Sequence, residues 1–385
     1  MLTAAALLVA ACGAGSNEGS GRGASEPDTP MVTVPQAESS PDENVFSALD
    51  DPRNPAFPEP LVDLSAIRSG GPPPDGIPPI DEPRFLAAND VDFLADDEPV
   101  LALTIGGVAR AYPVQVLIWH EIVNDTIDGV PVSVSYCPLC NSAIAYDRRL
   151  GDRVLDFGTS GQLYNSALVM YDRQTESLWS HFTGEAVVGH LTGEVLETFP
   201  VATVSWSSFR DAHPDALVLS RETGHDRSYG TNPYPGYDDV DTAPFLFDGE
   251  VDGRLAAKER IVGIDLPTGV VAVTESLLRD ERVVEVDDVV AWHLPGAASA
   301  LDASDVADGR DVGASNVFSP EVDGEQLTFR GVDGGFEDVE TGSQWDILGR
   351  ATGGPLEGSQ LTAIDHVDTF WFAWAAFQPD TELVR

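Results

Sequence analysis

The sequence predicts an α+β fold, mainly antiparallel β-sheet with short helices, built from two duplicated and diverged halves. Runs rich in β-branched residues alternate with Gly-containing turns along most of the chain, as in strands joined by hairpins. Helical patterns are few and short. A set of residues also recurs late in the chain at a nearly constant offset, which indicates an internal repeat. Strand-dominated halves with a few helices account for all three observations.

Turn signals divide the chain into its expected elements. Pro113 is pre-set for the first turn of a short helix over 114–120. Asp128-Gly129 stands between two β-branched runs and predicts a hairpin. Thr203 or Ser205 can cap a helix that runs to Ala212. The expected strands are 100–104, 108–112, 121–127, 130–136, 143–149, 153–157 and 216–220.

The internal repeat is carried by a specific run, D-x-x-T-x-S-x-W, at 172–179 and again at 338–345. Trp206 and Trp371 keep the same offset from these runs to within one residue. The expected first half covers 61–250 and the second, degenerate half 251–385, packed on the first. Since only the first half carries cysteines, we expect it to bear the site and the second to be a structural partner. What both copies retain is then expected to determine the fold.

The N-terminus predicts export. Residues 1–12 hold a short apolar stretch and small residues before Cys12, which is typical of a signal whose cysteine becomes lipidated. The stretch is shorter than the roughly 20 residues that a membrane span needs. Residues 13–60 are rich in Gly, Ser, Pro and acidic residues and are expected to be a disordered tether. The expected protein is an extracytoplasmic lipoprotein, attached to the cell membrane by its lipid.

The charge balance excludes one class of partner. The chain has 64 acidic and 21 basic residues and a formal net charge of −43. Such a surface repels nucleic acid, because phosphate contacts need a positive face. Adaptation to high ionic strength and a generally acidic proteome explain the charge equally well. No small-molecule or protein partner can be named from it.

Cys137 and Cys140 lie in one turn, Y-C-P-L-C-N, between two expected strands. A thioredoxin-type pair needs a helix after its cysteines, whereas the residues after Cys140 alternate like a strand. The turn is more similar to the knuckle of rubredoxin-type metal sites. His120 is the first candidate for a third ligand or a proton acceptor, with Glu121 and Asp125 behind it. Two thiolates and an imidazole favour Cu(I) or Zn(II).

Three alternatives remain open for this turn. A Cys137–Cys140 disulfide is natural outside the cytoplasm. A purely structural disulfide that closes so small a loop adds only about 2 kcal/mol to the free energy of unfolding. A redox-active pair is therefore the more plausible role. The protein is otherwise a non-catalytic binding module with a structural disulfide, or an enzyme with a cysteine nucleophile and His120 as its base.

A second group of residues is a candidate ligand loop. Residues 158–166 are rich in Gly, Ser and Thr. They contain Tyr164 and Asn165, and Arg173 follows them. Such a loop can present backbone N–H groups to an anion, with arginine as a charge partner. The aromatic run at 229–237 is expected to be an ordered loop that covers a cleft or packs.

Joint motifs connect the chain with a known family. They are W-H-E-I-V-N-D at 119–125, Y-C-P-L-C-N-S at 136–142, the stretch 161–179, P-Y-P-G-Y at 233–237 and R-L-x-A-K at 254–258. Over roughly 79–385 the sequence resembles exported prokaryotic proteins known as domain of unknown function 3179. His181 stands where such proteins often have glutamine, which argues against a ligand role. The family name implies no activity.

Overall fold

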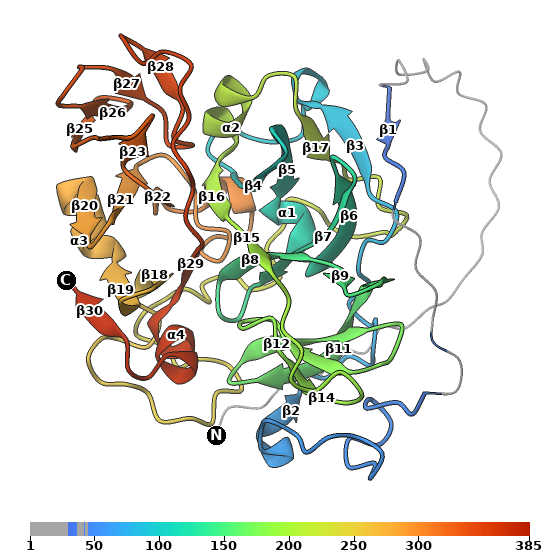
Figure 1. The fold of residues 1–385 in the computed structure, drawn as a ribbon. Coiled ribbons are helices and arrows are strands. Elements are labelled where there is room, and N and C mark those ends of the chain that lie inside the picture. Colours follow the sequence, from blue (N-terminus) through green and yellow to red (C-terminus); the bar gives the residue numbers. More distant parts are fainter. Residues whose placement is uncertain (1–29, 37–41, 43–44) are drawn as a thin grey trace. The chain divides into compact units, whose positions relative to one another are not determined.

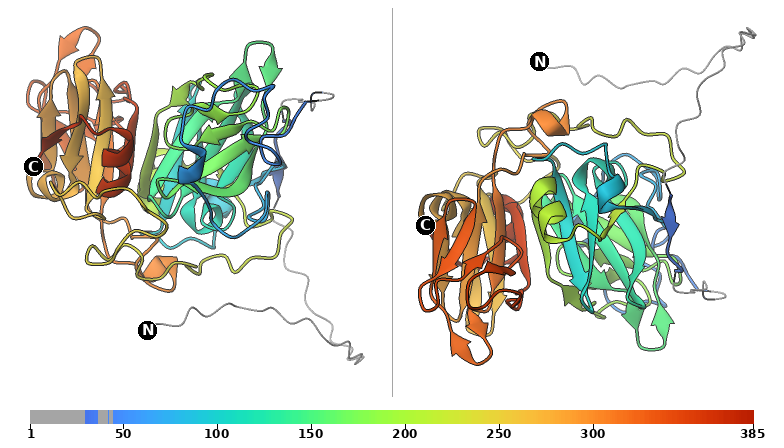
Figure 2. Two further views of the ribbon diagram at one scale, coloured as in Figure 1. Left: turned by 90° about the horizontal axis from the view of Figure 1, so that it is seen from below. Right: turned by 90° about the horizontal axis from the view of Figure 1, so that it is seen from above.

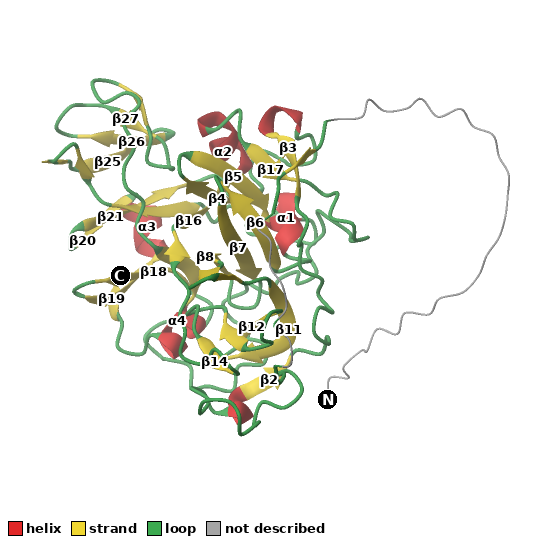
Figure 3. Cartoon of the chain, turned by 45° about the vertical axis from the view of Figure 1, so that its right-hand side comes forward, coloured by secondary structure: helices red, strands yellow, loops and turns green. Residues whose placement is uncertain are grey.

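The computed structural model of the 385-residue chain describes residues 30–36, 42 and 45–385. Antiparallel sheets dominate, with a few short helices, so the predicted α+β class is confirmed (Figure 1, Figure 3). Residues 31–385 form one compact unit. The predicted signal at 1–12, with Cys12, lies outside the described residues. Among the described residues, no helix is long and apolar enough to cross a membrane.

The first part of this unit contains three sheets and a small hairpin. The first sheet has the order β1 (Val32–Thr33), β3 (Arg84–Ala87), β17 (Leu217–Leu219), β5 (Val108–Pro113), β4 (Pro99–Ile105) and β16 (Val201–Ser205). The second has the order β15 (Thr198–Phe199), β8 (Ser142–Asp147), β7 (Val130–Cys137) and β6 (Ile122–Ile127). The third has the order β14 (Ala186–Val188), β13 (Leu178–Ser180), β12 (Ala167–Asp172), β11 (Phe157–Tyr164) and β2 (Ile67–Ser69). The hairpin is β9 (Arg149–Leu150) with β10 (Arg153–Val154).

The second part follows the same plan. Its sheets are β29 (His366–Phe370), β18 (Arg260–Leu266), β19 (Gly269–Thr274) and β30 (Glu382–Val384); β20 (Val283–Val286), β21 (Val289–Leu294) and β22 (Ala314–Phe318); and β25 (Phe329–Val332), β26 (Gly335–Asp338), β27 (Gln344–Trp345) and β28 (Ala351–Gly353). A small hairpin pairs β23 (Glu321–Val322) with β24 (Glu325–Gln326). The helices of the two parts are α1 (Val114–Leu117), α2 (Trp206–Ala212), α3 (Glu275–Glu281) and α4 (Trp371–Phe377), with single 3₁₀ turns at Leu64–Ala66, Ala88–Asp90 and Val306–Asp308.

Strand order and pairing direction recur between the two parts. The strand order β17-β5-β4-β16 of the first part matches the order β30-β19-β18-β29 of the second. In both groups only the first pair, β17–β5 or β30–β19, is parallel, and the other pairs are antiparallel. The register recurs as well, because Ala202 lies opposite Ala102 and Val367 opposite Gly263. The predicted origin of this recurrence, a duplication of 61–250 into 251–385, stays a prediction.

The repeated D-x-x-T-x-S-x-W run forms the same hydrogen-bonded turn in both places. Asp172 Oδ2 accepts from Trp179 Nε1 at 2.9 Å, and Asp338 Oδ2 accepts from Trp345 Nε1 at 3.0 Å. Each aspartate also accepts from the backbone N–H three residues on, at 2.6 Å. Both carboxylates are fully buried. Since a buried carboxylate with several donors fixes the strands around it, this geometry supports a structural role.

The two parts meet along two equivalent pairs of strands. β16 lies beside β22, and β29 lies beside β8, which occupies the place of β22 in the first part. Figure 2 shows the first part, mostly green, side by side with the second, orange to red. One hydrophobic core includes residues of both parts, among them Ile144 and Trp374. The junction therefore runs next to β7 and β8, the strands that carry the cysteine turn.

Part of the predicted tether is packed against the third sheet. Ala48 is buried, and its N–H donates to Glu176 O at 3.2 Å. Phe57 packs in the same small cluster. The expectation of disorder through residue 60 is therefore wrong for residues 45–60. Average composition hid the few apolar side chains that cover one face of the sheet.

Candidate thiol site

The predicted hairpin about Asp128-Gly129 carries the cysteine turn at its far end. Asp128 and Gly129 have φ of 48° and 77°, as the two central residues of a tight hairpin turn require. β7 ends at Cys137 and β8 begins at Ser142, so the turn is as predicted between strands. Cys137 and Cys140 are free thiols, 1% and 0% exposed.

Residues from the second part and from a long loop hold this turn in place. Cys140 O accepts from Phe370 N at 3.0 Å and from Thr369 Oγ1 at 2.7 Å. Leu139 O accepts from Tyr237 Oη at 2.9 Å. The second part thus contributes to the site through the backbone of the turn, without supplying a cysteine of its own.

Cys137 has the environment of a thiolate. Burial on its own raises the pKa of Cys137, but hydrogen bonds from the Cys140 thiol and from three backbone N–H groups outweigh it, so the net pKa lies below the ordinary value. The three N–H groups belong to Leu139, Cys140 and Leu168. Burial, followed by the hydrogen bond to Cys137 and its charge, raises the pKa of Cys140 well above the ordinary value. Of the two thiols, Cys137 is therefore the one that ionises more readily, and Cys140 holds its proton more strongly.

A chain of side chains leads away from Cys140. Its sulfur lies 2.9 Å from Ser142 Oγ, which lies 2.8 Å from His181 Nε2. His181 Nδ1 is 3.0 Å from Ser135 Oγ, and that hydroxyl donates to Ile144 O. Ser135 has a single proton and must therefore accept from Nδ1–H. This leaves Nε2 as an acceptor facing Ser142.

His181 is neutral and completely enclosed. Burial lowers its pKa to about 3, against a smaller opposing effect of the hydrogen bond to Ser142. His181, discounted as a ligand from the sequence, makes a contact that its local sequence does not predict, because the pairing of β12 with β13 decides where residue 181 lies.

Glu121 is a buried carboxyl beside the thiolate. Its side chain is 8% exposed and forms no hydrogen bond with the described residues. Burial raises its pKa well above the ordinary value, and the charge of Cys137 raises it further. Its φ is 60°, a left-handed conformation that is uncommon for a residue other than glycine. Such strain often accompanies functional sites.

An aromatic loop covers the turn, as the sequence suggested for the run at 229–237. Besides its bond to Leu139, Tyr237 Oη accepts from Phe245 N at 3.1 Å. Tyr234 is buried near Glu121 and Cys137, and burial, followed by the charges of these two groups, raises its pKa. The loop encloses the sulfurs instead of leaving them at the surface.

His120 makes its contacts elsewhere. Its Nδ1 lies 2.6 Å from Pro78 O and its Nε2 lies 2.6 Å from Tyr229 Oη. Burial lowers its pKa to about 4. Among the described residues, no three His, Cys, Asp or Glu side chains are grouped so that they could hold a metal ion. The predicted set of Cys137, Cys140 and His120 is therefore not assembled.

The remaining predicted residues are engaged in the fold. Asp125 is fully buried, forms an ion pair with Arg110 and accepts from Tyr112 Oη at 2.6 Å. Arg173 lies 2.5 Å from Asp81 and 3.1 Å from Asp75.

The candidate ligand loop is mostly strand. Tyr164 ends β11, and its ring packs edge-on against Phe377. Asn165 and Ser166, both with positive φ, form the tight turn to β12. The expected loop over 158–166 is thus corrected to a bulged strand and a hairpin turn. Glycine and serine gave this stretch the composition of a loop, and only Thr159 in it is β-branched.

A family model described as "Protein of unknown function (DUF3179)" matches residues 74–381. The chain belongs to this family. No curated protein and no solved structure matches it. The DUF3179 region includes both repeated parts, so it contains the cysteine turn and also Thr369 and Tyr237, which hold that turn. In this member the site is a product of the whole family region and not of its first part alone.

Proposed function

We propose that the protein is an exported thiol-redox protein whose centre is the Cys137–Cys140 pair. One observation carries the proposal: two free, buried thiols lie in one tight turn between β7 and β8, where hydrogen-bond donors lower the pKa of Cys137 below its ordinary value. Donors of this kind lower a thiol pKa, and the thiolate is the form that attacks a disulfide. A purely structural pair has no need of a stabilised thiolate.

The chemistry is thiol–disulfide exchange. The Cys137 thiolate attacks one sulfur of a disulfide R–S–S–R′, whose S–S bond breaks, and R′–S⁻ leaves and takes a proton from solvent. Cys140 then attacks the Cys137 sulfur and releases R–S⁻, closing the Cys137–Cys140 disulfide. The protein loses two electrons and the substrate disulfide gains them.

Ser142 and His181 serve the second step. Once Cys137 is in a mixed disulfide it no longer accepts the Cys140 proton. Ser142 Oγ, 2.9 Å from the Cys140 sulfur, is then the nearest acceptor, and it can pass its own proton to His181 Nε2. The proton finally neutralises R–S⁻. Because the sulfurs are buried, a large substrate reaches Cys137 only when the loop with Tyr234 and Tyr237 moves.

Binding of Cu(I) by the same two thiolates is the second candidate. The N–H groups of Leu139 and Cys140 aimed at Cys137 match the donor pattern of a metal-binding knuckle. Two soft thiolates suit Cu(I). Zn(II) prefers four ligands, and the described residues do not offer them around these sulfurs. His120 has no part in this candidate.

The proposed location is outside the cytoplasm, at the membrane, through a lipid on Cys12. The support is the small-residue run before Cys12 in the sequence. Cys12→Ser is expected to release the protein from the membrane fraction of an expressing cell. Retention of the variant there would contradict a lipid anchor.

The deciding experiment is a redox titration of the Cys12→Ser protein, which leaves only Cys137 and Cys140. We expect a reversible disulfide with a reduction potential above about −300 mV, the range of labile pairs. A pair that cannot be oxidised, or one reduced only far below this value, would contradict the proposal. Stoichiometric Cu(I) retained against a competing chelator, without disulfide exchange, would favour the second candidate.

A further inference from the structure

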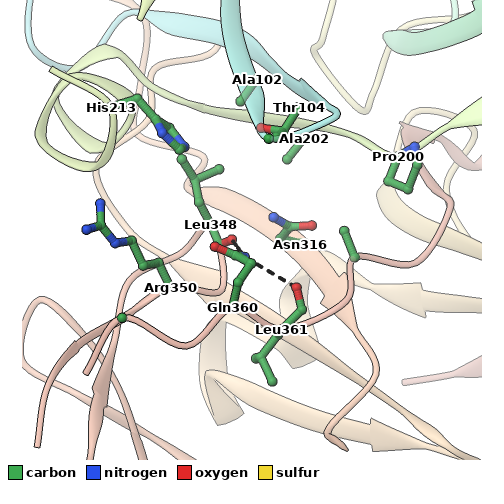
Figure 4. A pocket seen from close by; sticks show the side chains of 13 residues that line it. Ala102, Thr104, Pro200, Ala202, His213, Asn316, Leu348, Arg350, Gln360 and Leu361 are labelled. Atoms are coloured by element: carbon green, nitrogen blue, oxygen red, sulfur yellow. Dashed lines mark hydrogen bonds between the residues drawn. The ribbon is translucent and has the colours of Figure 1, made fainter. Parts of the chain in front are cut away.

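Two of the clefts at the junction of the repeated parts can be compared. One, of ≈ 510 Å³, is lined by residues of both parts and is drawn in Figure 4; we call it the first cleft. It involves Ala102 and Ala202 from β4 and β16, and Arg350 and Leu361 from the segment between β27 and β29. The second cleft, of ≈ 340 Å³, is lined by Gly263 and other residues described below.

The two clefts occupy equivalent places in the repeat. The pair Ala102–Ala202 of the first cleft corresponds to the pair Gly263–Val367 of the second, which occupies the same register. His213 of the first cleft follows α2 with φ −133° and ψ 63°. Gln378 of the second follows α4 with φ −128° and ψ 67°. The second cleft is therefore an internal control for the first.

Charge distinguishes the two clefts. At equivalent positions the first has Thr104 and Pro200, where the second has Asp265 and Asp365. The backbone of Arg350 forms an isolated β-bridge with Gln360. Its counterpart in the first part, Glu185, forms the same kind of β-bridge with Val195. Among the described residues, no carboxylate lines the first cleft, although the chain has 64 acidic residues. Asp211, Asp346 and Glu357 line an adjoining hollow, which also has Arg350 on its wall.

Hydrogen-bond donors remain available in the first cleft. Arg350 donates from one nitrogen to Ala212 O at 3.1 Å and forms no ion pair with a described residue, although its charge reaches the carboxylate of Asp346. The ring nitrogens of His213 have no hydrogen-bond partner among the described residues, and the ring packs against Phe209. Figure 4 shows His213 and Arg350 on one side of the pocket and Pro200 on the other. The remaining wall is largely apolar, with Leu361 on it.

We propose that the first cleft binds a small organic carboxylate, with its anionic group at Arg350 and its apolar body against the Ala and Leu wall. A guanidinium holds a carboxylate through two parallel hydrogen bonds, and a concave, mostly apolar pocket with a few polar groups is typical of ligand sites. The proposal does not depend on the thiol chemistry.

The experiment is calorimetric titration of the purified protein at low chloride with benzoate, with its neutral isostere benzamide and with inorganic phosphate. We expect saturable binding of benzoate, with benzamide and Arg350→Gln each weakening the interaction by about tenfold or more, as loss of a charged hydrogen bond does. The matched control is Glu185→Gln, which makes the same kind of change at the equivalent place beside the second cleft and should leave the benzoate affinity unchanged.

Three outcomes would overturn the inference. They are the absence of saturable benzoate binding, equal binding of benzoate and benzamide, and unchanged benzoate affinity in Arg350→Gln. Phosphate binding as tight as benzoate would overturn the role of the apolar wall. Circular dichroism and the thiol titration of Arg350→Gln verify that the variant is folded, since Arg350 lies away from the cysteine turn.

Discussion

Cys137 and Cys140 have the same residue type, lie in the same turn and are equally buried, yet their pKa values shift in opposite directions. The difference comes from hydrogen bonds, because those around Cys137 outweigh the effect of burial, whereas burial outweighs those that Ser142 makes to Cys140. Burial alone would raise both pKa values. The thiolate position is therefore a property of the knuckle geometry and not of exposure.

Replacing Cys140 by serine or alanine separates these effects. We expect Cys140→Ala to raise the pKa of Cys137, because it removes the side-chain donor to the sulfur. Cys140→Ser keeps a donor and should raise it less. Absorbance of the thiolate at about 240 nm against pH, in the Cys12→Ser background, measures this. Ser142→Ala is the control, since the Ser142 hydroxyl contacts Cys140 and His181 but has no hydrogen bond to Cys137. A Cys137 pKa that is the same in all variants would contradict a role of the Cys140 side chain in lowering it.

Replacing the carboxyl group by an amide should have opposite effects on stability at Glu121 and at Asp125. The folded pKa of Glu121 is raised, so the folded state keeps a proton that the unfolded state loses, and stability falls as pH rises above about 4.5. Glu121→Gln should abolish this loss, which amounts to at most about 1.4 kcal/mol per pH unit. Asp125→Asn breaks the buried pair with Arg110 and should cost about 3–5 kcal/mol.

Urea unfolding between pH 4 and 8 measures both variants. At pH 8, Glu121→Gln should be more stable than the wild type. Its free energy of unfolding should also depend less on pH. If it is less stable at pH 8, or keeps the wild-type slope, Glu121 does not hold a proton in the folded protein.

Among the helices and strands, the sequence predicts the features that depend on adjacent residues. Asp128-Gly129 and Pro113 identified a hairpin and a short helix because turn chemistry depends on adjacent residues. The direction of His120 was not local, since its ring is fixed by Pro78 O and Tyr229 Oη from distant segments. The bond from Thr369 to the cysteine turn is likewise not local, since 229 residues separate Thr369 from Cys140 in the sequence.

The repeated aspartate turn provides a matched pair of variants. Asp172→Asn and Asp338→Asn each replace a buried acceptor of several hydrogen bonds, and each should lower the free energy of unfolding by about 1–3 kcal/mol. Neither should change the thiolate titration of Cys137. Denaturant unfolding and absorbance titration test the two statements. A stable Asp172→Asn protein with an altered thiol titration would instead connect Asp172 with the site.

Over the whole molecule, the two parts with the same strand order differ in what they offer at their junction. The first supplies the cysteine turn, and the second supplies the Thr369 and Phe370 donors that hold it. The clefts on either side differ in charge, although the backbone around them has the same register. The recurring motifs could be recognised from adjacent residues in the sequence, whereas the contacts of the site come from segments that are far apart in it.

The net charge of −43 predicts how the whole protein responds to salt. Like charges repel most in the compact state, so screening should raise the free energy of unfolding as NaCl is added. The Debye length falls from about 10 Å at 0.1 M to about 3 Å at 1 M, so most of the gain should come at low concentration and then level off. Urea unfolding at several NaCl concentrations measures it, with sucrose as an uncharged control. Stability that is flat or falls with NaCl would mean that the surface carboxylates are compensated by pairing; a linear rise without levelling would point to salt exclusion rather than screening.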